Sequence, residues 1–324
     1  MPFKNEGKHL VECIESILAQ THSNWQLLAV DDHSEDNSFE ILTLFASRDN
    51  RITVFKNHGI GILPALQLAS SKVLGEYITR MDADDRMHPL KLEKLLNALS
   101  GSKTRAISCT NVQYFSNDDL GNGFLKYAHW LNQFNTNNSH YSEIYKECVI
   151  PSPSWMMKME DFKGIGGFTD LEYPEDYDFV FRLYQNKVKV VGVNEVLHYW
   201  RDHPERASRN LEQYKNQHFY QLKLKYFLEL EKDENKELIL LGAGPKGKTL
   251  AKVLIEMKID FKWATNNLKK VNHNIYGKIL FLYSDITDNQ QVVIAVSQRG
   301  EQEKIKKMLN EKELSENDHF FFFC

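Results

Sequence analysis

The chain has 324 residues, of which 42% are hydrophobic and 26% charged, and its net charge is −4. This length predicts about two globular domains of roughly 150 residues each, and the weak negative charge argues against nucleic acid as a partner. The four cysteines are far apart and form no Cys-x-x-Cys pair, which argues against a disulfide framework or a zinc site and fits a reducing cytoplasm. The first ten residues are too polar for a signal peptide, and no apolar run of about 18 residues is present.

Strands and helices alternate through the first ninety residues. The expected helices cover residues 8–20, 38–46 and 63–71, and the expected strands cover residues 26–30, 52–55 and 76–81. The run 26–30 is apolar without alternation, as in a strand buried on both faces of a parallel sheet. Pro89 then opens a further helix. This order predicts an α/β protein with a parallel sheet.

The middle of the chain is less regular. Residues 116–142 are rich in Asn, Ser, Gly and aromatic residues, which predicts a long loop of the kind that often binds ligands. A helix is expected at 175–185, a strand at 188–193 and a long aromatic-rich helix at 211–231. The highly charged run 231–237 predicts a linker, so the first domain is expected to cover residues 1–235.

A second unit is expected at residues 236–324. Its strands are predicted at 238–241, 261–264, 292–296 and 320–323, with helices at 248–257 and 301–310. Residues 242–247 read Gly-Ala-Gly-Pro-Lys-Gly between a strand and a helix, which is the context of a dinucleotide-binding turn. The pattern predicts a small Rossmann-like domain. The acidic residue that would bind a ribose is missing, because the next strand runs into Asn266 and Asn267, and we therefore do not expect NAD to bind.

Two predicted strands of the first domain end in acidic clusters, Asp31-Asp32 and Asp82-Ala83-Asp84-Asp85. The carboxyl ends of parallel strands share one rim, where ligands bind. Acidic residues alone would repel a nucleotide diphosphate, but a bound Mg²⁺ or Mn²⁺ takes oxygen ligands from carboxylates and phosphates alike. Asp32 is better suited to accept hydrogen bonds from a nucleobase or ribose. The alternative is that these are solvated turn residues.

An ordered series of short segments resembles glycosyltransferase family 2, which has the GT-A fold. The matching segments are residues 2–6, 16–21, 30–34, 57–59, 75–78, 81–85, 151–157, 166–168 and 175–178. A further segment, 198–203, resembles the closing motif of the family. The resemblance covers about residues 1–205. It implies an inverting transfer of a sugar from a nucleotide-diphosphate sugar to an acceptor hydroxyl.

The resemblance also implies roles for individual residues. The catalytic base would be Asp176. The nucleotide-sugar contacts would come from Pro2, Asp32, Asn57, Asp82, Asp84 and Arg201, and the ligands of Mn²⁺ or Mg²⁺ would be Asp82, Asp84, Asp85 and His203. A carboxylate suits the base role, because an acceptor hydroxyl becomes a good nucleophile only as its proton is removed. Two simpler explanations stay open: Glu175 and Asp176 are ordinary acids at a helix start, and His203 belongs to a surface turn.

Three further features leave alternatives open. Trp155 and Trp200 are either core residues or stack on sugar rings. The helix at 211–231 either packs across the catalytic domain or lies on a membrane surface through its aromatic residues. Members of the family carry an apolar strand before the segment that begins at Pro2, whereas here only Met1 precedes it. This suggests a truncated or misassigned start and leaves the first strand in doubt.

The expected function is glycosyl transfer in the synthesis of a cell-surface glycan, by a cytoplasmic enzyme that works at or near the inner face of the membrane. The partners would be a nucleotide-sugar donor and a glycan or lipid-linked acceptor, with homo-oligomerisation left open and the sugar, nucleotide and acceptor not named by the sequence. A non-catalytic nucleotide or nucleotide-sugar sensor is the rival, but it predicts an incomplete site. An NAD-dependent oxidoreductase would rest on residues 242–247 alone.

Overall fold

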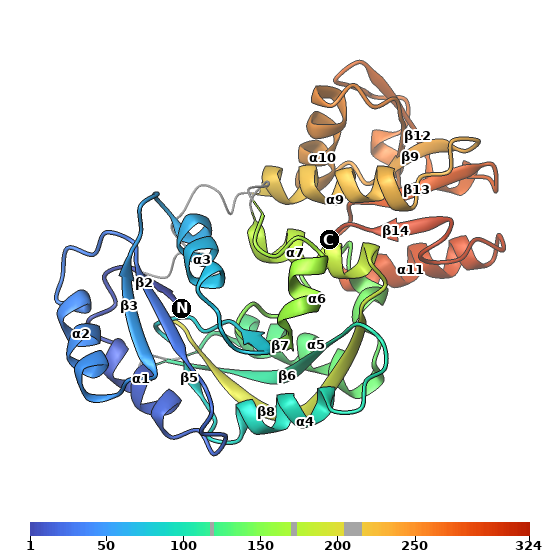
Figure 1. Cartoon of the computed structure of the whole chain (residues 1–324). Helices are drawn as coiled ribbons and strands as arrows, with labels where there is room; N and C mark the ends of the chain where they lie inside the picture. Colours follow the sequence, from blue (N-terminus) through green and yellow to red (C-terminus); the bar gives the residue numbers. More distant parts are fainter. Residues whose placement is uncertain (117–119, 170–173, 204–215) are drawn as a thin grey trace. The chain divides into compact units, whose positions relative to one another are not determined.

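The computed structural model describes residues 1–116, 120–169, 174–203 and 216–324, drawn in Figure 1. The chain divides into two compact units. The first unit comprises residues 1–141, 149–171 and 175–210, and the second comprises residues 142–148, 172–174 and 211–324. The acidic clusters and the expected base all belong to the first unit.

The first unit begins with a three-stranded parallel sheet. Its elements are β1 (Pro2–Phe3), α1 (Leu10–Leu18), β2 (Leu27–Asp31), α2 (Ser38–Arg48), β3 (Ile52–Lys56) and α3 (Ile62–Ser71). Successive side chains of a strand point to opposite faces. Accordingly, Leu27 and Ala29 pack with α1 and α2, while Leu28 and Val30 pack with α3 (Figure 1). The expectation that this strand is buried on both faces is confirmed.

A five-stranded mixed sheet completes the first unit, in the order β4-β7-β6-β8-β5. Its strands are β4 (Tyr77–Thr79), β5 (Arg86–Met87), β6 (Ala106–Phe115), β7 (Trp155–Lys158) and β8 (Lys189–Arg201), and its helices are α4 (Lys91–Leu99), α5 (Asn122–Asn137), α6 (Met159–Gly164) and α7 (Glu175–Gln185). Only β6 and β8 are parallel neighbours, and the other pairs are antiparallel. The all-parallel arrangement expected from the sequence therefore holds for the first sheet but not for the second.

The long loop predicted at residues 116–142 is wrong, because helix α5 occupies most of it. Ala128, Leu131 and Phe134 recur at helical spacing and are buried, the first two in a cluster with strand β6. The helix also approaches β8 closely, since a Cβ atom on Gly192 would lie 2.5 Å from the carbonyl oxygen of Asn135. The helix was not predicted because the many Asn and aromatic residues of the segment obscure the helical spacing of its buried apolar residues.

Strand β8 extends well beyond the predicted range of 188–193 and ends at Arg201. Its second half pairs with β6 after an irregularity at Thr110 and Asn111, and it pairs with the short strand β5 at His198 and Tyr199. This extension matters for the site, because it carries His198 and Arg201 to the acidic loop between β4 and β5. Helix α7 covers the range expected for it.

The second unit contains a six-stranded sheet in the order β11-β12-β10-β9-β13-β14. Its elements are β9 (Glu237–Leu241), α10 (Pro245–Glu256), β10 (Lys262–Thr265), η3 (Leu268–Lys270), β11 (Asn274–Ile275), β12 (Lys278–Leu282), η4 (Tyr283–Asp285), β13 (Gln290–Ile294), α11 (Arg299–Asn310) and β14 (Phe320–Phe322). All neighbours are parallel except β11 and β12. From β12 to β14 the order is that of an open, doubly wound sheet.

Two glycines of the 242–247 turn have a packing reason that is independent of any cofactor. Gly242 has a φ of 119°, and a Cβ atom there would lie 2.9 Å from the carbonyl oxygen of Ala295. A Cβ atom on Gly247 would lie 1.9 Å from the carbonyl oxygen of Gly242. The strand and helix α10 thus approach each other so closely that side chains cannot fit, which explains much of the glycine pattern.

Helix α9 (Asn216–Leu230) groups with the second unit, whereas the sequence assigned it to the first; residues 211–215 lie outside the described range. Phe227 is fully buried, with its ring 5.2 Å from that of Phe321 and 5.8 Å from that of Phe323. Tyr220 and Tyr226 are also buried. These three aromatic side chains, which were considered as membrane anchors, therefore pack inside the protein, whereas Phe219 is half-buried. None of the helices within the described ranges is long and apolar enough to cross a membrane.

Candidate active site

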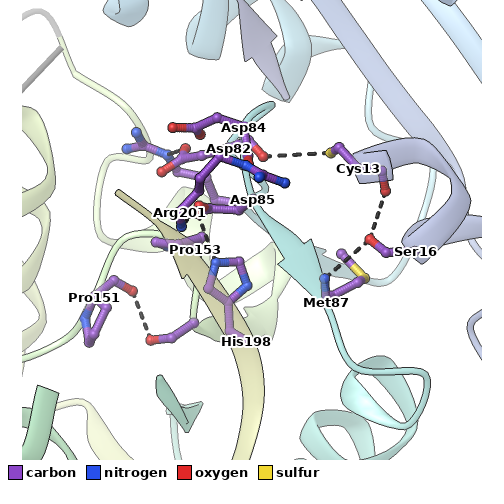
Figure 2. A network of polar contacts seen from close by, with 12 residues as sticks. Cys13, Ser16, Asp82, Asp84, Asp85, Met87, Pro151, Pro153, His198 and Arg201 are labelled. Atoms are coloured by element: carbon purple, nitrogen blue, oxygen red, sulfur yellow. Dashed lines mark hydrogen bonds and ion pairs between the residues drawn. The ribbon is translucent and has the colours of Figure 1, made fainter. Parts of the chain in front are cut away.

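The acidic loop between β4 and β5 alternates strictly between buried and half-exposed side chains. Met81 and Ala83 are buried in the core cluster that also contains β1 and α1. The side chains of Asp82 and Asp84 are 24% and 13% exposed, whereas that of Asp85 is fully buried. Figure 2 shows the three aspartates gathered beside Arg201 and His198. Two carboxylates are therefore reachable from solvent and the third is not.

Asp85 points into the protein and binds protein groups with both oxygens. Its Oδ1 accepts a hydrogen bond from the backbone N–H of Arg201 at 2.7 Å, and its Oδ2 lies 2.9 Å from Nε2 of His198 (Figure 2). On the other side of the ring, Nδ1 lies 3.0 Å from Nζ of Lys91. An ammonium group can only donate, so Nδ1 accepts and Nε2 carries the proton given to Asp85. This geometry differs from the metal-ligand role expected for Asp85 and assigns it to holding β8 against the loop.

Lys91 is a fully buried cation at the start of α4. Its Nζ donates to the carbonyl oxygen of Pro153 at 2.5 Å and to His198. Burial lowers the pKa of Lys91 to about 7, and the negative charges of Asp85 and Asp82 oppose that change. The chain Lys91–His198–Asp85 thus links α4, β8 and the acidic loop through buried hydrogen bonds. Such connected networks fix geometry more firmly than isolated pairs.

Arg80 joins the acidic loop to the start of helix α7. Its Nε lies 3.0 Å from Oδ1 of Asp82, and its NH1 lies 3.0 Å from Oε1 of Glu175. The Arg80 and Glu175 side chains are only 6% and 4% exposed, so this is a buried ion pair. The consequence is that Asp82 and Glu175 are attached to one arginine, and Asp176 follows Glu175 directly.

Asp176 is half-buried in the first turn of α7, and Oγ of Ser152 donates to its Oδ2 at 3.0 Å. Burial and, to a smaller extent, the charge of Asp176 raise the pKa of the adjacent Glu175 to about 7, and Arg80 opposes the rise. A cavity of about 10 Å³ adjoins the pair, and its lining includes Arg80, Ser152 and Asp176. That volume holds about one water molecule.

Asp84 faces the end of strand β8. Its Oδ2 lies 3.1 Å from Nε2 of His203, and its carbonyl oxygen accepts a hydrogen bond from Nε of Arg201 at 2.6 Å. The Arg201 side chain is 5% exposed, and its guanidinium also forms an ion pair with Glu12 and covers the ring of Phe115 at 4.4 Å. Of the two residues expected from the closing motif, His203 therefore contacts the acidic loop directly. Arg201, expected to meet the diphosphate, is engaged by Glu12.

The other expected nucleotide contacts lie at the ends of the three-stranded sheet. Pro2 is in β1 and pairs with Val30 of β2, so the first strand forms with two residues. Asp32 follows β2, and its Oδ1 accepts hydrogen bonds from Nδ2 of Asn57 at 2.7 Å and from the N–H of Gly61 at 2.9 Å. Asp32 and Asn57 thus form one polar cluster after the carboxyl ends of neighbouring strands, which matches the expected rim.

The two tryptophans considered for sugar stacking belong to aromatic clusters. Trp155 is 2% exposed, and its ring stacks on that of Phe179 at 4.9 Å. Trp200 stacks on Tyr114 at 5.0 Å. Trp155 is a core residue, which is the simpler of the two explanations left open by the sequence.

Four residues of the network had no role in the sequence interpretation: Glu12, Arg80, Lys91 and His198. The ion pair of Arg80 could have been predicted, because a cation next to the acidic end of a strand is well placed to pair with one of its carboxylates. The alternation through residues 81–87 also predicts that Asp85 points inward. Lys91 and His198 gave no such signal, because they lie 107 residues apart and meet only in the folded chain.

The residues of the loop suit a divalent cation. Asp82 and Asp84 offer half-exposed carboxylate oxygens, and His203 offers an imidazole nitrogen within 3.1 Å of Asp84. These donor types match the ones Mn²⁺ takes in proteins. The guanidinium of Arg80, whose Nε lies 3.0 Å from Oδ1 of Asp82, shows that the loop already attracts positive charge.

The comparisons with known proteins give the class. Residues 1–166 match the model of Glycosyl transferase family 2, and the chain belongs to that family. Over 130 residues it is 38% identical to glycosyltransferase GlyG of Streptococcus pneumoniae serotype 4, a match that covers 40% of this chain and 42% of GlyG. Over 201 residues it is 28% identical to an uncharacterized glycosyltransferase of Methanocaldococcus jannaschii, covering 60% of this chain and 66% of that one. The chain thus spans less than two thirds of these relatives.

Solved structures show the fold. TarS 1–349 of S. aureus in complex with UDP-GlcNAc superimposes with a TM-score of 0.53 at 16% identity, covering 78% of this chain and 70% of that one. The mannosyltransferase PcManGT of Pyrobaculum calidifontis, in complex with GDP-Man and Mn²⁺, gives a TM-score of 0.52 at 15% identity, covering 79% and 68%. The chain therefore has the mixed α/β GT-A glycosyltransferase fold.

Proposed function

We propose that the protein is an inverting glycosyltransferase that moves a sugar from a nucleotide-diphosphate sugar to an acceptor hydroxyl of a cell-surface glycan or its lipid-linked precursor. One observation carries this proposal. Arg80 ties Asp82, of the expected donor-binding loop, to Glu175, the neighbour of the expected base. A carboxylate for the donor side and one for the acceptor side are thereby held in one unit.

In the proposed reaction the acceptor oxygen attacks the anomeric carbon of the donor sugar. A carbon–oxygen bond forms as the bond to the diphosphate breaks on the opposite face, which inverts the anomeric centre. The acceptor proton passes to a carboxylate oxygen of Asp176, and the nucleoside diphosphate leaves. Asp176 suits this role, because it lies at the start of a helix, where the dipole favours its charged form, and because Ser152 orients it.

The donor would be bound at two places. Asp32 and Asn57, with Pro2 beside them, would contact the nucleoside. Mn²⁺ or Mg²⁺ would be held by Asp82 and Asp84, with His203 as a further ligand, and when bound it would neutralise charge on the leaving diphosphate. The named neighbours support this, since PcManGT is described with GDP-Man and Mn²⁺. Asp85 and Arg201 would position the loop, because each is occupied by protein groups.

The test is donor hydrolysis and transfer with a panel of UDP, GDP and CDP sugars in the presence of Mn²⁺. We expect the protein to release one kind of nucleoside diphosphate. This activity should be lost in EDTA and should return when Mn²⁺ or Mg²⁺ is added. Asp84→Asn should weaken metal and donor binding. Asp49→Asn is the matched control, because Asp49 is a carboxylate of the same unit that pairs with Arg51. Full activity in chelator would overturn the metal assignment, and no turnover of any donor would overturn the reaction.

We further propose that the second unit is a Rossmann-like accessory domain that takes no part in donor binding. The end of β10 offers Asn266 in place of an acid, and its Nδ2 donates to Glu301 at 2.9 Å. The domain would then serve for docking of a partner protein, for oligomerisation, or for binding of a nucleotide-like regulator.

A further inference from the structure

Three side chains with metal-binding atoms lie together beside the acidic loop: Glu6, His9 and His203. One ligand atom of each lies within 4.8 Å of the ligand atoms of the other two. The rings of His9 and His203 are 5.1 Å apart between centroids. All three side chains are half-buried, so an ion can reach them from solvent.

Backbone hydrogen bonds fix the two segments that carry these residues. The N–H groups of His9 and Leu10 donate to the carbonyl oxygen of Glu6 at 2.8 and 3.0 Å, which forms a turn that brings Glu6 and His9 to one side. The N–H of Glu6 donates to Oγ of Ser38 at 2.8 Å. On the other side, the N–H of Asp202 donates to the carbonyl oxygen of Phe115 at 2.8 Å, just before His203.

We propose that Glu6, His9 and His203 form a binding site for a borderline first-row divalent cation such as Zn²⁺ or Co²⁺. Two imidazoles and one carboxylate make a donor set that suits these ions, whereas Mg²⁺ prefers an all-oxygen set. Three protein ligands leave at least one coordination position for water or for an oxygen of a bound molecule. The ligands come from two segments far apart in the sequence, residues 6–9 and His203, so the site exists only in the folded first unit.

This site goes beyond the proposed donor site, because Glu6 and His9 have no part in the latter. The two are neighbours, since His203 also contacts Asp84 at 3.1 Å. Cation binding at Glu6 and His9 would engage His203 and so act on the acidic loop. The inference does not depend on the identity of the donor sugar, and binding can be measured without any nucleotide.

The experiment is a Co²⁺ titration of the full-length, metal-free protein, followed by visible absorption and by calorimetry, with Zn²⁺ as competitor and Mg²⁺ as comparison. We expect Co²⁺ bound at Glu6, His9 and His203 to show a histidine-type spectrum and to be displaced by Zn²⁺ and not by Mg²⁺, whereas any Co²⁺ held at the proposed donor site by Asp82 and Asp84 is displaced by Mg²⁺. His9→Gln and Glu6→Gln should each weaken binding at least ~10-fold, since even groups behind the ligands contribute 10- to 100-fold. His22→Gln is the matched control, because His22 lies in the same unit, is not one of the three ligands, and its Nε2 is hydrogen-bonded to the carbonyl oxygen of Asn24.

Asp82→Asn separates this site from the donor site. It should leave Co²⁺ affinity within about twofold of the native value while it impairs donor turnover. The proposal is overturned if native protein binds no Co²⁺ at millimolar concentration, if both His9→Gln and Glu6→Gln bind like the native chain, or if Asp82→Asn abolishes Co²⁺ binding. Melting temperatures of all variants check that each one folds, and the two ligand variants test the same site independently.

Discussion

Replacement of Arg80 by methionine tests the buried link between the acidic loop and helix α7. Methionine keeps most of the length and apolar stem but removes the guanidinium. Glu175 then loses the cation that binds its Oε1, and its Oε2 has no hydrogen-bond partner among the described residues. A buried carboxylate would be left without a counter-charge. Breaking a buried pair in this way costs about 3–5 kcal/mol of folding free energy.

The cost should depend on pH. The pKa of Glu175 in the folded chain is about 7, above its ordinary 4.5, so the native state binds more protons than the unfolded state between these values. Stability therefore falls as pH rises through this window. Without Arg80 the largest opposing influence on the pKa of Glu175 is lost, and the window extends above pH 7. The penalty of Arg80→Met should be about 1–2 kcal/mol near pH 5, where Glu175 is neutral, and reach its full size near pH 8.5.

Urea unfolding followed by tryptophan fluorescence measures the free-energy penalty of Arg80→Met. The probe is suitable because four tryptophans lie in the first unit: Trp25, Trp130, Trp155 and Trp200. The same loss should lower the melting temperature by roughly 6–20 °C. Adding Glu175→Gln to the variant should restore part of the stability at pH 8.5. Arg51→Met is the control, because the Arg51–Asp49 pair is 33% and 19% exposed and should contribute under about 1 kcal/mol. A penalty for Arg80→Met that is independent of pH and no larger than that control would refute the reasoning.

Three further outcomes are expected. Asp176→Asn should keep donor binding and lower transfer by ~100-fold or more, mainly in kcat, and transfer near the native rate would mean that the base lies elsewhere. For Lys91, the folded pKa of about 7 lies below its ordinary 10.5, so the unfolded state binds more protons between them and native stability should rise with pH. Lys91→Met should lack that rise, which urea unfolding at pH 7 and 9 would detect as up to about 3 kcal/mol. NAD and NADP should produce no melting shift in the full chain, whereas a ligand at 100 times its dissociation constant would add ~2.7 kcal/mol.

The sequence was most informative where burial follows a simple period. Strand β2 is apolar from Leu27 to Val30 because both faces are covered, and helices α1 and α3 carry apolar residues at helical spacing. These local patterns predicted most of the first sheet and most elements of the second unit. They failed for α5, whose buried stripe is diluted by Asn and Gly residues, and for the mixed sheet, because β7 and β5 are short and pair antiparallel with distant strands.

The candidate site divides in the same way. The sequence predicted which residues are chemically suited to donor and base roles, because acids after a strand end and at a helix start stand out locally. It did not predict how the chain holds them. Arg80 contacts Glu175, 95 residues away in the sequence, and Lys91 contacts His198, 107 residues away. No local sequence pattern predicts such long-range contacts. The hydrogen bonds that Asp85 forms with β8 were not predicted for another reason: its neighbours Asp82 and Asp84 made it resemble a third acid of the same kind.

The alternation in the acidic loop limits how this part of the gene can vary in length. Asp84 and Asp85 are adjacent, yet the Asp84 side chain is partly exposed to solvent, whereas that of Asp85 is fully buried and accepts hydrogen bonds from β8. Deleting or inserting one codon between Arg80 and Met87 would exchange inward and outward positions for every residue after it. A carboxylate would then be lost from the solvent side and an apolar side chain from the core, in a single step. Surveys of natural or engineered variants should therefore find substitutions in this loop but no single-residue insertions or deletions.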